Sequence, residues 1–205
     1  MTPFLYDGEA FESAWDPFEI AVFGGVAGSV ISVLKGANRH SHARQRLLPP
    51  LSKDKTVSSE FDRLAGHQIS DAKIQCLEQF QNKLLAAASA AMSDDASDEY
   101  YDLTELNDDT NPPKITLTVT QAEINSTLSA LTAIRTYLAE ILDIQTDDDS
   151  EQIYQLLYSA DQPESAEPDS EDLQQQKFFA STFAAAGFVQ ETLLEAVVAR
   201  GTNGA

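Results

Sequence analysis

Five basic residues lie close together in the segment RHSHARQRLLPPLSKDK, which runs from residue 39 to residue 55. They are Arg39, Arg44, Arg46, Lys53 and Lys55, and the segment contains one acid, Asp54. Guanidinium and ammonium groups bind phosphates and carboxylates. The segment is therefore a candidate for contact with DNA or with an acidic protein surface. The sequence after it, residues 59–80, has the length and turn of a loose helix-turn-helix.

The charge of the whole chain argues against DNA as the main partner. The 205 residues include 33 acids and 13 bases, which gives a formal net charge of −20. Such a surface repels polyphosphates. The helix that would read DNA has Lys73 as its one base near the start, with Asp71 and Glu78 beside it. We therefore expect a protein partner and keep direct DNA binding as an alternative; a homodimer is also compatible with the sequence.

Cys76 is the single cysteine, so a disulfide within one chain and a zinc site with paired thiols are both excluded. Helical periodicity places it at the edge of an apolar face, about a quarter turn from the centre. The ordinary interpretation is a half-buried small side chain. The alternative is a redox thiol, which needs exposure and a lowered pKa.

The remaining motifs give no reason to propose a cofactor, a metal or catalysis. His40 and His42 have no neighbouring residues that complete a metal site. The run FGGVAG lies inside an apolar stretch, not between a strand and a helix as a dinucleotide loop requires. Gly24 and Gly28 share one helical face there and predict close helix packing. We expect a non-enzymatic protein without a cofactor.

The apolar run from Ile20 to Leu34 is fifteen residues long. As a helix it spans about 22 Å, less than the roughly 30 Å of a bilayer core. It therefore predicts a buried helix and no membrane span. The preceding residues hold acids and no base, unlike a secretory signal, so we expect a cytoplasmic protein.

Two short segments share one pattern of a strand followed by a helix. AFESAW leads into DPFEI, and ITLTV leads into TQAEI. Asp16 and Thr120 are predicted to cap the two helices, with Glu19 and Glu123 reaching back to the caps. The simplest arrangement pairs the strands in a ribbon with both helices on one side.

The fold class predicted from these patterns is mainly α: a bundle of about four to five helices with a small two-stranded β ribbon, in a single domain over residues 1–205. Apolar residues recur at helical spacing over residues 124–142 and 177–200, and after Ser70. A short helix is predicted to stop at Gly66. The last helix is predicted to bury Phe179, Phe183, Phe188, Leu193, Leu194 and Val197.

Two acidic segments are predicted to be mobile loops within the domain. Residues 93–113 hold eight acids and residues 143–172 hold eleven, and neither segment contains a base. A short helix is compatible with Ile153 to Tyr158. Solvation explains the charge of both segments, and docking of a basic protein is the alternative.

Four stretches together resemble a known family. They are RLLPP followed by EFDRL, ALTAIRTYLAEILDI with its Ile134–Arg135 pair, FVQETLLEAV, and GEAFESAWDPFEIAVF. The chain resembles the AosR-like family of actinomycete oxidative-stress regulators, formerly an actinobacterial domain of unknown function. The resemblance implies a cytoplasmic, non-enzymatic regulator that associates with transcription proteins and DNA. Ile69 to Lys73 departs from the family pattern by lacking an Arg, and a lone Cys76 excludes an intramolecular disulfide switch.

The resemblance also changes the interpretation of the basic segment. Its centre, RLLPP, carries the likeness, and two leucines with two prolines favour a buried elbow. The flanks, residues 39–44 and 53–55, are then the better candidates for contact with a partner.

Overall fold

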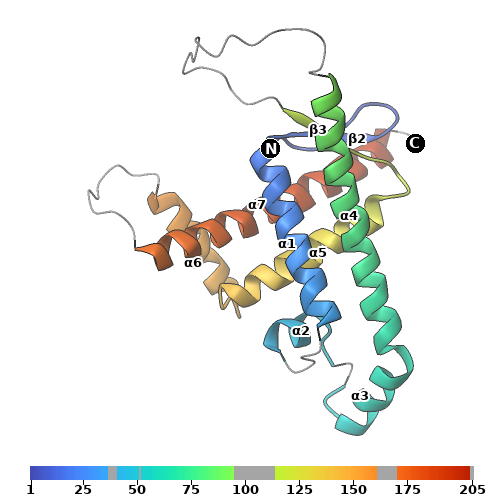
Figure 1. Ribbon diagram of the computed structural model, residues 1–205, viewed down its shortest axis with the longest axis vertical. Helices are drawn as coiled ribbons and strands as arrows, with labels where there is room; N and C mark the ends of the chain where they lie inside the picture. Colours follow the sequence, from blue (N-terminus) through green and yellow to red (C-terminus); the bar gives the residue numbers. More distant parts are fainter. Residues whose placement is uncertain (37–40, 51, 95–113, 161–169, 204–205) are drawn as a thin grey trace.

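The computed structural model describes residues 1–36, 41–50, 52–94, 114–160 and 170–203 (Figure 1). The described chain is mainly helical with a small antiparallel sheet, which confirms the predicted class. The strands are β1 (Leu5–Tyr6), β2 (Phe11–Trp15) and β3 (Ile115–Val119). The helices are α1 (Pro17–Lys35), α2 (His42–Leu47), α3 (Lys55–Phe61), the π-helical turn η1 (Asp62–Gly66), α4 (His67–Asp94), α5 (Ile124–Ile141), α6 (Asp147–Ala160) and α7 (Glu171–Asn203).

The two predicted strands pair with each other, as β2 and β3, in antiparallel register from Phe11 opposite Val119 to Trp15 opposite Ile115. Alternate residues of both strands are buried, because one face of the sheet packs on the helices. Trp15 is completely buried and meets the ring of Phe23 edge to face, with 4.9 Å between the ring centroids.

The sheet has a third strand that the sequence did not predict. β1 has two residues and pairs with β2 through a tight turn. In that turn Gly8 has a φ of 111°, and the carboxylate of Asp7 accepts hydrogen bonds from the backbone N–H groups of Glu9 and Ala10. A two-residue strand carries too little alternation to be recognised by periodicity.

The first predicted helix cap is confirmed and the second is confirmed in half. At α1, Asp16 accepts a hydrogen bond from Glu19 N–H, and Glu19 accepts one from Asp16 N–H, each at 2.8 Å. At α5, Glu123 accepts hydrogen bonds from the N–H and the hydroxyl of Thr120, at 2.9 and 2.6 Å. The Thr120 hydroxyl therefore serves Glu123 and caps no backbone N–H, and α5 begins at Ile124.

α5 lies at the centre of the bundle. It packs against α4 and α1 on one side, against α7 on another, and against the short α2 near its end (Figure 1). Leu131, Ile134 and Leu138 are completely buried. α5 is therefore the helix that fixes the positions of the others.

The expected stop at Gly66 is wrong. α3, η1 and α4 follow one another without a break, and both Phe61 and His67 have right-handed helical φ and ψ values. A single π-helical turn accommodates Gly66 inside the helix. The loose helix-turn-helix is consequently not formed by residues 59–80.

The expectation of a loop over residues 143–172 is also wrong in part, because α6 occupies Asp147–Ala160. Asp149 accepts hydrogen bonds from Gln145 N–H and Thr146 N–H, while Thr146 accepts one from Asp149 N–H. Ile153 is buried in the core. Leu157 also packs against the core, so a cap and two apolar residues hold this acidic sequence as a helix. Residues 95–113 and 161–169, the rest of the predicted loops, lie outside the described residues.

Two helices, α1 and residues 171–202 of α7, are long and apolar enough to cross a membrane. In these two windows 39% and 33% of the residues are buried inside the protein. Length and composition do not separate a membrane span from a core helix, so the cytoplasmic location stays a prediction.

Removing the charge of Glu123 should lower stability in a pH-dependent way. Partial burial raises the pKa of Glu123, but hydrogen bonds from Thr120 and the ammonium group of Lys83 outweigh it, so the pKa lies below 4.5. A lowered folded-state pKa gives stability that is present above pH 4.5 and lost as the pH falls through the folded pKa. We expect Glu123→Gln to lower the free energy of unfolding at pH 7 by about 0.5–1 kcal/mol. Urea unfolding at several pH values measures this.

The difference between wild type and Glu123→Gln should shrink below about pH 4 as the carboxylate protonates. Glu9→Gln, on the exposed turn between β1 and β2, is the control and should leave stability unchanged. An equal destabilisation by Glu123→Gln at pH 3 and pH 7 would contradict the assignment.

Candidate protein-binding site

Arg44 of the basic segment points into the protein. Its guanidinium donates hydrogen bonds to the carbonyl groups of Val33 and Leu34 in the last turn of α1. The final carbonyl groups of a helix have no partner within the helix and carry a partial negative charge. Arg44 therefore caps the C-terminal end of α1.

Arg46 binds the turn that follows α5. It donates to the carbonyl group of Ile144 and pairs with Glu140, with 3.4 Å between Nη1 and Oε2. There Asp143 has a φ of 55° and Ile144 N–H donates to Ala139, which is a Schellman ending. The two arginines of α2 thus bind the C-terminal end of α1 and the turn after α5. Leu47, the last residue of α2, is buried.

The five basic residues therefore do not form one exposed patch. Lys53 and Lys55 are exposed, and Arg39 lies outside the described residues. Elsewhere in the described chain, Lys35 pairs with Glu78, and Lys114 lies 4.0 Å from Asp16. The buried elbow predicted for the RLLPP centre is confirmed at Leu47 only, because Leu48 is half-buried and Pro49 and Pro50 are exposed.

Cys76 is half-buried and packs against the hydrophobic core, in line with the ordinary interpretation of the sequence. Its redox activity stays a prediction. Among the described residues no group of three or more His, Cys, Asp and Glu is placed to hold a metal ion.

A polar groove lies between α4 and the start of α5, lined by residues that include Gln79, Asn82 and Ser126. Its two charges already have partners. Lys83 pairs with Glu123 at 2.9 Å and donates a hydrogen bond to the carbonyl group of Thr118 at 2.8 Å. These interactions of Lys83 hold β3 and the start of α5 against α4. Among the residues that line this groove, no nucleophile is paired with a base.

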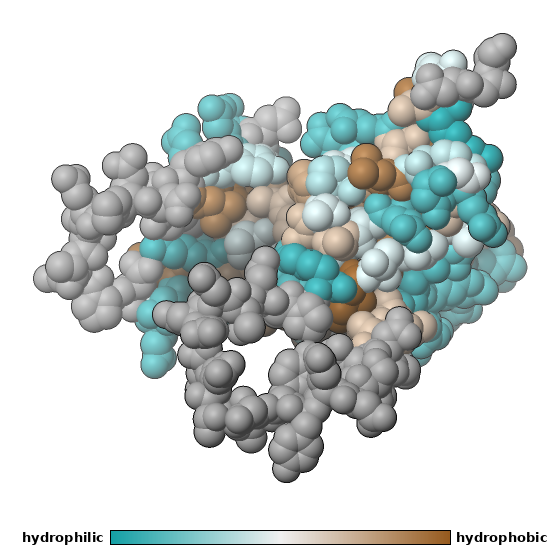
Figure 2. Space-filling view, turned by 90° about the horizontal axis from the view of Figure 1, so that it is seen from above, coloured by the Kyte–Doolittle hydropathy of each residue, from teal (hydrophilic) through white to brown (hydrophobic). Residues whose placement is uncertain are grey.

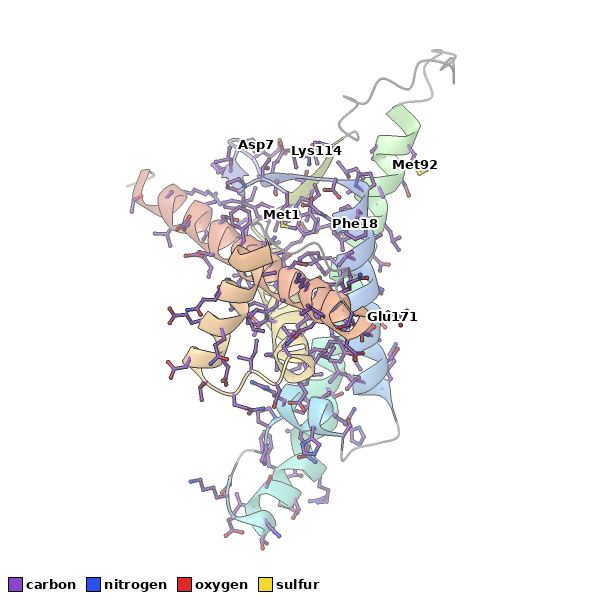
Figure 3. All side chains as sticks on the ribbon, turned by 90° about the vertical axis from the view of Figure 1, so that its left-hand side faces the viewer. Met1, Asp7, Phe18, Met92, Lys114 and Glu171 are labelled. Atoms are coloured by element: carbon purple, nitrogen blue, oxygen red, sulfur yellow. The ribbon has the colours of Figure 1, made fainter. Side chains whose placement is uncertain are left out.

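The outer face of α7 carries apolar side chains that nothing in the described chain covers. Phe188 and Leu194, predicted to be buried, are 38% and 44% exposed, and Val198 is 65% exposed. They line an open groove of about 940 Å³ whose other wall includes Tyr154 of α6. α6 and α7 lie at the front of Figure 3. This groove, named the α7 groove below, is the candidate binding site.

The floor of the α7 groove is a clasp between α5 and α7. Arg135 donates to the side-chain oxygen of Gln190 at 3.1 Å, and Gln190 donates to the hydroxyl of Thr132 at 3.0 Å. The guanidinium lies 5.2 Å from the ring centroid of Phe183. A Cβ added at Gly187 would lie 3.6 Å from this guanidinium, which is an ordinary van der Waals contact.

Two carboxylates border the α7 groove. Glu191 and Glu195 are exposed, and neither has an ion pair or hydrogen bond to the described residues. Large apolar side chains beside unpaired carboxylates can anchor an apolar face and attract positive charge. A second shallow groove, which includes Leu5 and Arg200, shares Glu195 and Ala199 with the first and continues the surface towards β1.

The sequence missed this site because its apolar residues were assigned to the core. At about 100° per residue the large apolar residues Phe183, Phe188, Leu193 and Leu194 are spread around much of the helix, so α7 has more apolar surface than a single core-facing stripe needs. That excess was the available signal. Figure 2 shows the molecule from the end that carries the sheet, where hydrophilic surface surrounds smaller apolar areas.

Replacing Arg44 or Arg46 by Ala should destabilise the fold. Arg44→Ala removes the donor to the last carbonyl groups of α1, and Arg46→Ala removes the donor to Ile144 and the ion pair with Glu140. For each change we expect a loss of about 1–3 kcal/mol in the free energy of unfolding. Lys53→Ala and Lys55→Ala, in the same segment but exposed, should change it by less than about 0.5 kcal/mol. Chemical denaturation measures all four variants; equal small effects would show that the two arginines are not structural.

No curated protein and no solved structure matches the chain. The model of a family described as a domain of unknown function, DUF2017, matches residues 1–197, and the chain belongs to that family.

Proposed function

We propose that this chain is a non-enzymatic regulatory protein that acts by binding a protein partner in the α7 groove. The observation that carries the proposal is the exposure of Phe188, Leu194 and Val198 along one groove. Exposed contiguous apolar surface bordered by polar groups is typical of interaction sites. Burying such side chains against a partner is the main favourable term in association.

The distribution of charge supports a protein partner over DNA. Arg44 and Arg46 are used at helix ends inside the fold, which leaves Lys53 and Lys55 as the exposed described cations of the basic segment. The chain as a whole carries −20. A duplex would meet strong repulsion with few phosphate contacts to offset it.

The cellular role that we propose is transcriptional control of stress genes in the cytoplasm, as in the oxidative-stress regulators that the sequence resembles. Two of the stretches that carry this resemblance, around Arg135 and around Gln190, meet in the clasp under the α7 groove. A binding site built on that clasp is consistent with a regulator that acts by association.

Photo-crosslinking tests the proposal in the cells that naturally produce the protein. A photoreactive amino acid at Leu194 or Val198 should give a discrete crosslinked protein, because both side chains project into the groove. The same group at Leu64 is the matched control. Leu64 is 63% exposed and lies in η1, outside the α7 groove. The product should also disappear when Phe188 is changed to Asp.

The result that contradicts the proposal is the absence of any crosslinked product at 194 and 198, or identical products at 64. Circular dichroism of each variant checks that the fold is intact.

A further inference from the structure

We propose that the occupant of the α7 groove is a basic amphipathic helix of another protein, about four turns long. This inference rests on the proposed function, because it names the chemistry of the partner at the same site. Three properties of the groove carry it: its length, the chemistry of its lining and the sign of its charge.

The length of the groove matches a helix. Its α7 wall runs from Ala184 to Ala199. At about 1.5 Å per residue this stretch is about 23 Å long, the length of four to five helical turns. A helix laid along it can present apolar residues at positions i, i+4, i+7 and i+11 to the groove.

The lining selects an apolar face on the occupant. Phe188, Leu194 and Val198 of α7 and Tyr154 of α6 expose large parts of their side chains there. Aromatic and aliphatic side chains of this size form the anchors of helix-in-groove complexes. An occupant without an apolar face would leave these side chains in water.

The charge of the groove selects positive flanks. Glu191 and Glu195 border it without ion pairs to the described residues, whereas its one cation, Arg135, is held on Gln190 and the ring of Phe183. The chain as a whole is also acidic, with 33 acids against 13 bases. Lysines and arginines beside the apolar face of the occupant would therefore be attracted at long range and paired on contact.

The same charge argues against a second copy of this chain. In a twofold symmetric dimer the same patch faces itself, so Glu191 and Glu195 of both copies would meet at the rim. Two chains of −20 would also repel each other before contact. An anionic membrane surface is disfavoured for the same reason.

Three synthetic peptides of about sixteen residues test the inference with the full chain. The first has leucines at i, i+4, i+7 and i+11 with lysines on the flanks; the second replaces the lysines by glutamates; the third scrambles the first so that no apolar face remains. Fluorescence anisotropy measures binding at low and at physiological salt. The first peptide should bind at least about tenfold more tightly than the other two, and more weakly at high salt.

Variants separate the groove from general attraction of basic peptides. Leu194→Asp adds negative charge, so it would strengthen a purely electrostatic association, but it should weaken binding in the groove by about tenfold or more. Glu191→Gln with Glu195→Gln should weaken binding by about two- to tenfold. Val57→Asp, at a residue that is 50% exposed on α3, is the matched control and should leave binding in the groove unchanged within about twofold.

Equal binding of the lysine and glutamate peptides, or undiminished binding to Leu194→Asp, would overturn the inference. So would a dimer in sedimentation experiments that Leu194→Asp dissociates, since the occupant would then be a second copy. If residue 194 crosslinks to another protein but either of these two contradicting peptide results is found, the proposed function stands and this inference alone is removed. An absence of crosslinks removes the proposed function itself.

Discussion

The burial of α5 on several sides is the constraint on which the rest of the structure depends. Leu131, Ile134 and Leu138 are completely covered, and the covering helices are α4 and α1 on one side and α7 on the other. A helix packed in this way leaves its neighbours one face each for the core. α7 meets that requirement with Phe183, Val189 and Leu193, so the exposed parts of Phe188, Leu194 and Val198 are not needed for the core.

The arrangement of charge follows from the same packing. Helices that end near the core need partners for their last carbonyl groups, and Arg44 supplies one at α1. Arg46 binds the Ile144 carbonyl group in the turn after α5 and pairs with Glu140. Other cations, such as Lys83, are paired with carboxylates at element junctions. A chain with few bases thus uses many of them for its own fold, and the outer surface is left with the excess of acids.

The parts of the fold that depend on neighbours in sequence could be predicted, and those that depend on packing could not. The Asp16–Glu19 capping box and the alternation in β2 and β3 are local patterns, and both were predicted. The continuation of the helix through Gly66 was missed, because a glycine residue does not by itself decide whether the backbone leaves the helical conformation. The inward orientation of Arg46 also could not be predicted, since its partners are about a hundred residues away in the chain.

The α7 groove shows why that limit matters for function. A pattern of apolar residues identifies surface that must be covered, but it does not say whether the cover comes from the same chain. Here Phe188 and Leu194 meet the sequence criterion for burial, and the described chain leaves them 38% and 44% exposed. No packing contact inside the fold requires a large apolar residue at Val198, where a polar side chain would cost little stability and would improve solubility. The fold itself therefore gives no reason for these side chains, and the proposed partner would supply the surface that covers them.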